Sequence, residues 1–135
     1  MSRSPRRRPT RGARQQQRAT TRQLARQQDV LRVLLQQRGK PLAVDVLAKR
    51  VGVSERTVER DLERIRSARL PLRGRGGSGG GVWLDVTRAR SSLSLSDEQV
   101  MALLLVIDEI DADLPETLGQ VRDLLRSQLA DPRLF

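Results

Sequence analysis

The sequence predicts a mainly α-helical fold with one small β-hairpin, ordered as three helices, the hairpin and a further pair of helices. Two observations lead to this prediction. Apolar residues recur every three or four positions in several segments, and Gly, Pro and Ser residues separate these segments. Two short apolar runs, around residues 70–72 and 82–86, flank a glycine-rich stretch, as the strands of a hairpin do.

Residues 1–21 are predicted to form a disordered, arginine-rich tail. They contain seven arginines, two prolines and almost no apolar side chain, a composition that cannot bury a core. Three interpretations of this tail stay open. It keeps the chain in solution, or it is an arm that follows phosphates or enters a minor groove, or it is an organelle transit peptide.

The first helix is expected over residues 21–38 and the second over residues 44–50. Gly39 ends the first helix, and Pro41 enforces the break. The second helix begins without a good N-cap, because Ala43 has no side-chain acceptor. The apolar stripe of the first helix consists of Leu24, Leu31, Leu34 and Leu35.

A tight turn at Gly52 connects the second helix to a third, which is expected over residues 55–68. Gly52 can adopt a positive φ, and Ser54 can cap the third helix by accepting from the N–H groups of its first turn. One face of this helix carries Arg56, Arg60 and Arg64 at every fourth residue. The buried face is predicted to consist of Val58, Leu62 and Ile65.

Residues 74–81 are expected to form the loop of the hairpin. Because eight residues exceed what a tight turn requires, the loop is either a flexible surface loop or a wing that rests on phosphates. Trp83 is the only Trp and is expected to pack beneath the hairpin. Since Tyr is absent and single-strand binders stack bases on several aromatic side chains, any nucleic-acid partner is expected to be a duplex.

Residues 88–95 are expected to be a linker, and residues 96–131 a helical dimerisation or interaction segment. Ser96 and Gln99 form a capping box, and Leu95 with Val100 can form the hydrophobic staple around it. A second helix is expected over residues 114–130. Its signals are a capping box of Asp113 with Glu116 and an apolar face of Leu118, Val121, Leu125 and Leu129.

The first helix of this segment is apolar on almost every face from residue 100 to residue 107. One small domain cannot cover such a surface, so we expect a homodimer. The residues expected to be buried between the two chains are Met101, Leu104, Leu105 and Ile107. The alternative is that the two helices fold back on the first three.

Charge is unevenly distributed along the chain, whose net charge is +10. Residues 1–28 contain nine arginines and no acidic residue. Residues 38–90 contain 13 basic and 6 acidic residues, and residues 91–135 contain 3 basic and 9 acidic ones. This pattern indicates a surface that binds polyanions and a separate acidic surface.

The chain contains no Cys and no His. This excludes disulfides, thiolate nucleophiles, most zinc sites and any triad that needs an imidazole base. We therefore expect no enzymatic activity, cofactor or metal. The longest apolar run, residues 100–107, is far shorter than the roughly 20 residues of a membrane-spanning helix, so no membrane association is expected.

Two helices connected by a tight glycine-containing turn are typical of the DNA-binding helix-turn-helix, whose second helix enters the major groove. That helix needs an apolar inner face and a cationic outer face that reads base edges and phosphates. Residues 55–68 meet both requirements. Residues 22–87 are therefore predicted to form a winged helix-turn-helix domain, followed by the C-terminal helical pair.

The segment 39–62 resembles the N-terminal winged helix-turn-helix of the DeoR-like and WYL-domain transcriptional regulators. Gly-Val-Ser-Glu-Arg-Thr-Val at 52–58, followed by Arg60-Asp61-Leu62, is close to the usual recognition-helix sequence of that family. Residues 70–84 match the family's wing, and residues 93–99 are similar to the helix after the wing in WYL members. Glu59 departs from the pattern, since relatives often have a basic residue there. The WYL sensor domain has no counterpart in the sequence, so effector sensing is not expected.

The resemblance and the helical spacing together predict a sequence-specific regulator of bacterial transcription that binds double-stranded DNA in the cytoplasm, at the nucleoid. The expected DNA-binding residues are Ser54, Arg56, Thr57, Arg60, Arg64, Arg73 and Arg75. Each arginine could instead be a solvated charge paired with a helix neighbour, and Asp61 is expected to be structural. Two alternative functions stay open, a sequence-tolerant architectural protein and an adaptor that modulates a larger regulator.

Overall fold

The computed structural model describes residues 8–77, 79–86, 93–110 and 114–129. Their contacts divide the chain into two compact units, one within residues 25–94 and the other within residues 1–24 and 95–135. The described elements are mostly helical, with one two-stranded antiparallel sheet, which confirms the predicted fold class. Residues 11–24 of helix α1 (Arg11–Gln36) belong to the second unit and its later residues to the first.

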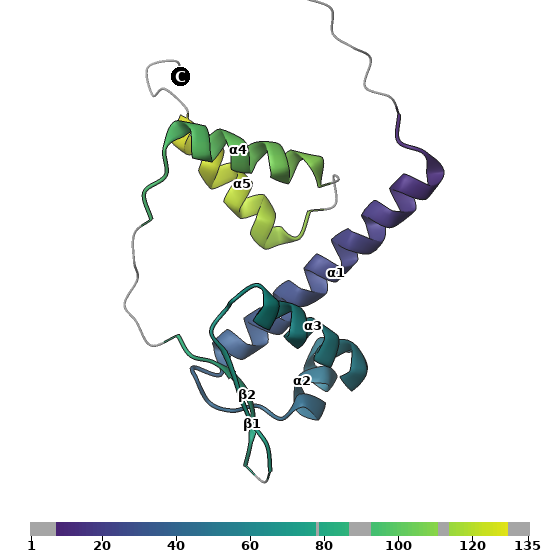
Figure 1. The fold of residues 1–135 in the computed structure, drawn as a ribbon, viewed down its shortest axis with the longest axis vertical. Helices are drawn as coiled ribbons and strands as arrows, with labels where there is room; N and C mark the ends of the chain where they lie inside the picture. Colours follow the sequence, from purple (N-terminus) through teal and green to yellow (C-terminus); the bar gives the residue numbers. More distant parts are fainter. Residues whose placement is uncertain (1–7, 78, 87–92, 111–113, 130–135) are drawn as a thin grey trace, which may run out of the picture. The chain divides into compact units, whose positions relative to one another are not determined.

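The first unit contains the later part of α1, α2 (Val44–Val51), α3 (Glu55–Ser67) and the hairpin, as Figure 1 shows. Its core forms where apolar side chains from each of these elements meet. Val30 and Leu34 of α1, Leu47 of α2 and Val58 of α3 are almost fully buried in it. On α1 the buried face differs from the predicted stripe, because Val30 is in the core whereas Leu35 is half exposed.

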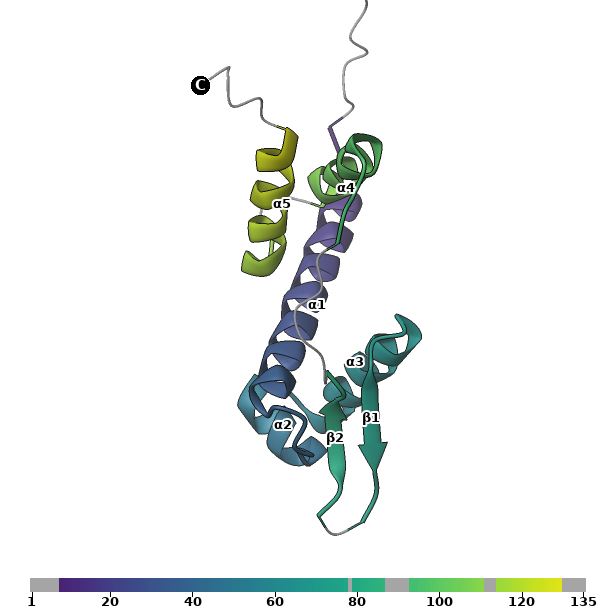
Figure 2. The ribbon, with the colours of Figure 1, turned by 90° about the vertical axis from the view of Figure 1, so that its left-hand side faces the viewer.

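The hairpin consists of β1 (Leu72–Arg75) and β2 (Gly81–Leu84), which lie side by side in Figure 2. Leu72 pairs with Leu84 and Arg75 with Gly81, so residues 74 and 75 extend the first strand and the loop is shorter than the predicted 74–81. The other edge of β2 pairs with Leu42 through two backbone hydrogen bonds of 2.9 Å between Leu42 and Val82.

Gly81 makes this second pairing possible. Its φ is +141°, and a Cβ at this position would lie 2.4 Å from the carbonyl oxygen of Leu42. Any side chain here would push the two backbones apart, because non-bonded atoms do not approach so closely. The hairpin is therefore held against the segment before α2 at a point where only glycine fits.

Helix α1 begins at Arg11 rather than near Thr21, so residues 11–21 are helical and not the disordered tail that their composition predicts. Arginine, glutamine and alanine, which dominate this stretch, are good helix formers. Thr10 adds a local start signal, because its hydroxyl accepts from the backbone N–H of Ala13 at 3.2 Å. Residues 1–7 of the predicted tail lie outside the described residues.

The second unit contains the first part of α1 together with α4 (Asp97–Glu109) and α5 (Glu116–Leu129). The capping box of Ser96 and Gln99 is present and begins α4. The second predicted capping box involves Asp113, which lies outside the described residues, as do residues 88–92 of the predicted linker. Val100, Ile107 and Leu125 form the buried core of the helical pair.

Candidate nucleic-acid interface

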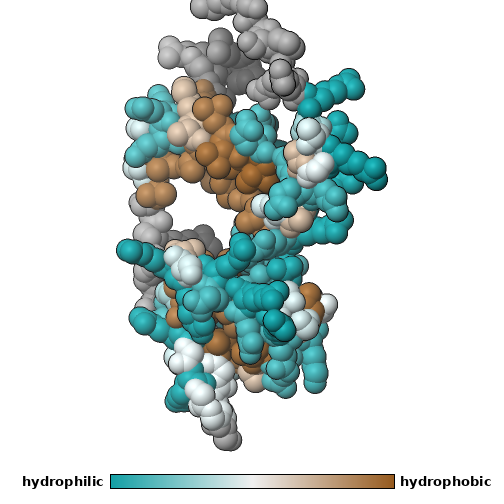
Figure 3. Space-filling view, turned by 45° about the vertical axis from the view of Figure 1, so that its right-hand side comes forward, coloured by the Kyte–Doolittle hydropathy of each residue, from teal (hydrophilic) through white to brown (hydrophobic). Residues whose placement is uncertain are grey.

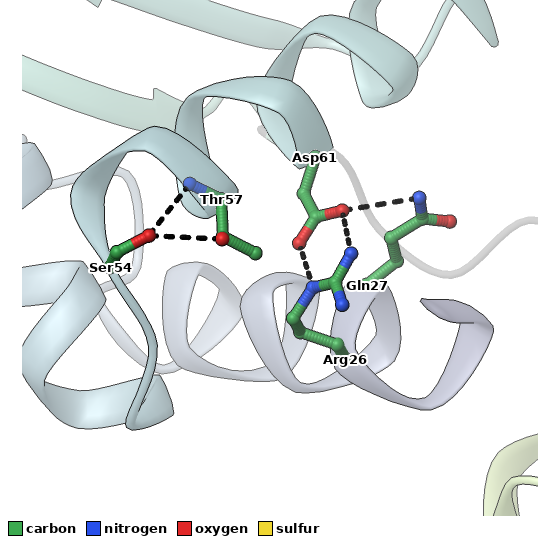
Figure 4. A network of polar contacts seen from close by, with 5 residues as sticks. All are labelled: Arg26, Gln27, Ser54, Thr57 and Asp61. Atoms are coloured by element: carbon green, nitrogen blue, oxygen red, sulfur yellow. Dashed lines mark hydrogen bonds and ion pairs between the residues drawn. The ribbon is translucent and has the colours of Figure 1, made fainter. Parts of the chain in front are cut away.

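The turn between α2 and α3 has the geometry that its sequence predicts. Gly52 has a φ of +81°, and its N–H donates to the carbonyl of Ala48 at 2.8 Å, which closes the last turn of α2. Ser54 then caps α3, because its Oγ accepts from the backbone N–H of Thr57 at 3.2 Å. The hydroxyls of Ser54 and Thr57 also lie 3.0 Å apart (Figure 4). The start of α3 is therefore fixed by local contacts.

Helix α3 has two faces with different chemistry. Val58, Asp61, Leu62 and Ile65 are buried against the core. Arg56, Arg60 and Arg64 are exposed, and their four-residue spacing places them in one row on the opposite side of the helix. Thr57 is half-buried at the edge of this row. The helix thus presents a cationic row to solvent while its apolar face holds it on the domain.

Asp61 is the one charged side chain on the buried face of α3, and it forms a bidentate ion pair with a residue of α1. Arg26 donates from Nε to Oδ2 at 2.5 Å and from Nη2 to Oδ1 at 2.9 Å, as Figure 4 shows. The hydrogen bond and the charge of Asp61 raise the pKa of Arg26 above its usual value, against the opposing effect of burial. Gln27 adds a longer contact of 3.4 Å. The pair fixes α3 against α1, as the structural role predicted for Asp61 requires.

Arg26 is not among the residues expected from the sequence, although the sequence carries a signal for it. Arg26 precedes Val30 by one helical turn and Leu34 by two, so all three share the face of α1 that meets the core. A long cationic side chain on an apolar helix face needs a buried anion, and Asp61 occupies the corresponding position of α3.

Charge on α3 is balanced overall but not at each position. The helix contains four basic and four acidic residues. Asp61 is neutralised by Arg26, and Glu63 lies 3.6 Å from Arg66. Arg56 and Arg60 make no ion pair or hydrogen bond with any residue that the structure describes, so neither is a charge paired with a helix neighbour there. Both guanidinium groups are available to an external acceptor.

The hairpin carries the two remaining residues that were predicted to bind DNA. Arg73 lies opposite the half-buried Trp83 in the ladder, and its Nε is 3.9 Å from Asp85. Arg75 ends β1 and donates from Nη2 to the carbonyl of Gly79 at 3.4 Å. Both side chains are exposed and weakly held, so an anion of higher charge can displace their present partners.

The family model of the HTH domain matches residues 26–81. The matched range begins at Arg26, which pairs with Asp61, and ends at Gly81, which contacts Leu42. It therefore covers the described first unit almost completely. The match supports a DNA-binding helix-turn-helix domain, of the type found in DeoR-like and WYL-domain regulators. No solved structure matches the chain. Among the described residues, no helix has the length and apolar character needed to cross a membrane.

The four residues predicted to form a dimer interface do not share one environment. Met101 and Leu105 are 52% and 71% exposed. Leu104 is half-buried and packs against the core of the helical pair. Ile107 is buried inside its own chain against Leu125, so it is not available to a second copy. The run from residue 100 to residue 107 is apolar on all sides. Its sequence therefore does not indicate which side of α4 packs against α5.

Proposed function

We propose that this protein is a regulator of bacterial transcription that reads double-stranded DNA with α3 in the major groove and the hairpin as a wing. The observation that carries the proposal is the pair Arg56 and Arg60. They project from a capped, anchored helix and have no partner among the described residues. A guanidinium can donate two hydrogen bonds to the O6 and N7 of guanine, and a rigid helix keeps this geometry in place.

The other predicted residues have supporting roles in this proposal. Thr57 contacts bases or nearby phosphates at the helix start, and Ser54 places the N-terminal N–H groups of α3 near a phosphate. Arg64 contacts the DNA backbone further along the helix. Arg73 and Arg75 contact phosphates from the wing. These contacts set the register of the protein on the duplex, while Arg56 and Arg60 provide sequence preference.

The proposed regulator is a homodimer that binds a two-fold symmetric site. Its interface forms from the exposed apolar side chains of α4 and α5, which make the brown area over these helices in Figure 3. They are Met101, Leu103, Leu105, Val106, Val121 and Leu124. Three buried residues are a small core for a pair of helices, and a second copy would enlarge it. A monomer in sedimentation at micromolar concentration would refute the dimer without affecting the DNA-binding proposal.

The test of DNA binding starts with selection of preferred sites from random duplexes by the full chain. The variant R56E/R60E should then lose at least about thirtyfold in affinity for the selected site, since each bidentate contact is worth about 1 to 3 kcal/mol. The control variant R32E/R126E has the same change in net charge on exposed residues of α1 and α5. It should bind within a few fold of the natural protein. Equal affinity of R56E/R60E and the control would contradict the assignment of α3 as recognition helix.

A sequence-tolerant architectural protein is the second candidate. It is favoured by the nine arginines in residues 1–28 and by the balanced charge of α3. The selection experiment separates the two functions, because an architectural protein enriches no sequence. DeoR-like or WYL-related ancestry and association with the nucleoid belong to the first proposal.

A further inference from the structure

The first part of α1 carries a row of four arginines, Arg11, Arg14, Arg18 and Arg22, which we call the arginine ridge. Their spacing of three, four and four residues places them within an arc of about 80° on the helix. All four side chains are exposed, and together they border one shallow groove with Pro9, Gln15 and Ala19. The ridge exists because residues 11–21 are helical, and in a disordered tail the same arginines would share no face.

The ridge faces away from the contacts that α1 makes within its unit. The other side of the helix carries Ala13, Gln17, Thr20 and Thr21, which line a cavity with the end of α4. Gln17 donates there from Nε2 to the carbonyl of Glu109 at 2.8 Å. Packing of α1 within the unit therefore uses one face and leaves the arginines on another.

The ridge has no anionic neighbour along its own helix. The first acidic residue of the chain is Asp29, seven residues after Arg22. None of the four arginine side chains has an ion pair or hydrogen bond with another residue in the described parts of the chain. Arg14 and Arg18, and likewise Arg18 and Arg22, are like charges at i and i+4, which destabilise a helix by a few tenths of a kcal/mol per pair. A bound polyanion removes this repulsion.

The dimensions of the ridge fit a nucleic-acid backbone. Eleven residues of helix separate Arg11 from Arg22, a rise of about 16 Å. One strand of a DNA duplex presents a phosphate about every 3.4 Å along its axis, so about five phosphates span this length. Guanidinium groups bind phosphate oxygens with two parallel hydrogen bonds.

A membrane surface fits the same helix poorly. Helices that lie in a lipid interface insert an apolar face opposite their cationic one. The face of α1 opposite the ridge is instead small and polar, with Gln16, Gln17 and Thr20. Over residues 11–21 this face has no side chain long and apolar enough to enter a bilayer.

We propose that the arginine ridge is a second DNA contact, which binds the phosphate backbone of a duplex without regard to sequence and is separate from the recognition helix. The inference rests on the proposed function in that it takes duplex DNA as the partner. It divides the work between two helices. Helix α3, with its balanced charge, supplies sequence preference, and the ridge supplies electrostatic affinity.

The test measures the affinity of the full chain for a duplex of random sequence at several salt concentrations. The variant R11Q/R14Q/R18Q/R22Q removes the ridge charges and keeps residues that favour a helix. Loss of four phosphate contacts should reduce the slope of log Kd against log salt by about 3 to 4. The matched control R3Q/R6Q/R7Q/R8Q removes the same charge from residues that precede α1. It should reduce the slope clearly less, and circular dichroism should show equal helix content in both variants.

Two results would overturn the proposal. The first is an unchanged slope in the ridge variant, and the second is an equal loss in both variants, which would assign the effect to total charge. If the ridge variant lost binding to phosphatidylserine vesicles while its DNA binding stayed unchanged, the ridge would be a membrane-binding surface instead. Failure of the recognition-helix proposal looks different. There the natural protein shows no preferred site, whereas the ridge variant still lowers the slope on random DNA.

Discussion

Helix α3 and the first part of α1 both carry arginines in a row along one exposed face, but they differ in what lies between the arginines. In α3 the row is interrupted by Glu59 and Glu63, and the helix is neutral as a whole. In the first part of α1 the intervening residues are Gly, Ala, Gln and Thr, and every charge is positive. An interrupted row cannot bind well to every phosphate backbone, because its carboxylates are repelled wherever they meet one. In the proposed complex, α3 binds well only to duplexes on which its arginines find better acceptors, and this is how a helix can gain specificity.

The two helices also differ in how they are held. Helix α3 has a side-chain cap, a buried apolar face and the ion pair to Arg26. The first part of α1 has a cap at Thr10 and one side-chain hydrogen bond to Glu109. Reading base edges requires fixed positions, whereas attraction to phosphates does not. Three further experiments test this contrast.

The largest expected effect belongs to Arg26→Ala. It leaves the carboxylate of Asp61 buried with only the long contact from Gln27, which should cost about 3 kcal/mol of unfolding free energy. Urea unfolding followed by Trp83 fluorescence measures it, since Trp83 lies in the same unit. The double variant R26M/D61L should recover most of the loss, because an apolar pair leaves no buried charge. Equal stability of Arg26→Ala and the natural protein would mean that the pair does not hold α3.

An intermediate effect is expected when each helix loses its cap. Ser54→Ala should cost about 1 kcal/mol, because the N–H of Thr57 loses its acceptor at the start of α3. Thr10→Ala removes the matching contact at the start of α1. Hydrogen exchange should accelerate only at the first turn of the helix that lost its cap. Affinity for the selected site should fall with Ser54→Ala and stay constant with Thr10→Ala. The opposite order would contradict the division of roles between the helices.

The smallest effect is expected from Arg18→Glu, and it separates stability from binding. The substitution replaces two like-charge pairs with attractive ones to Arg14 and Arg22, so α1 should gain a few tenths of a kcal/mol per pair. Affinity for random-sequence DNA should nevertheless decrease. Arg8→Glu is the control, because it makes the same charge change before the helix begins. If α1 becomes more helical and binding is unchanged, the ridge does not contact phosphates.

Features that depend on neighbours in the sequence were predictable from it. The turn at Gly52, the cap at Ser54 and the capping box of α4 rest on contacts within four residues, and the buried face of α3 follows the helical period of its apolar residues. The pair of Arg26 and Asp61 joins residues 35 positions apart, and the bridge between Leu42 and Val82 joins two separate segments. Such contacts depend on how elements pack. The local pattern places Arg26 on the core face of α1 but does not identify its partner.

Composition alone was misleading at the start of α1. Residues with few apolar side chains suggest disorder, since they bury little surface, yet helix propensity and the cap at Thr10 favour a helix there. At α4 the difficulty was the reverse. Because apolar residues lie on every side of α4, its sequence does not indicate which side is buried. Only the position of α5 determines that Ile107 is buried and Leu105 is exposed.

The contact of Gly81 with Leu42 makes the wing adjustable. The backbone is fixed at this glycine and at Arg75, its partner in β1, while the described residues between them, Gly76, Gly77, Gly79 and Gly80, contribute nothing to the core. Doubling the length of a flexible loop costs only about 0.6 kcal/mol. Residues can therefore be added or removed between Arg75 and Gly81, and the reach of the hairpin, the proposed wing, changes without any change in α3, the proposed recognition helix.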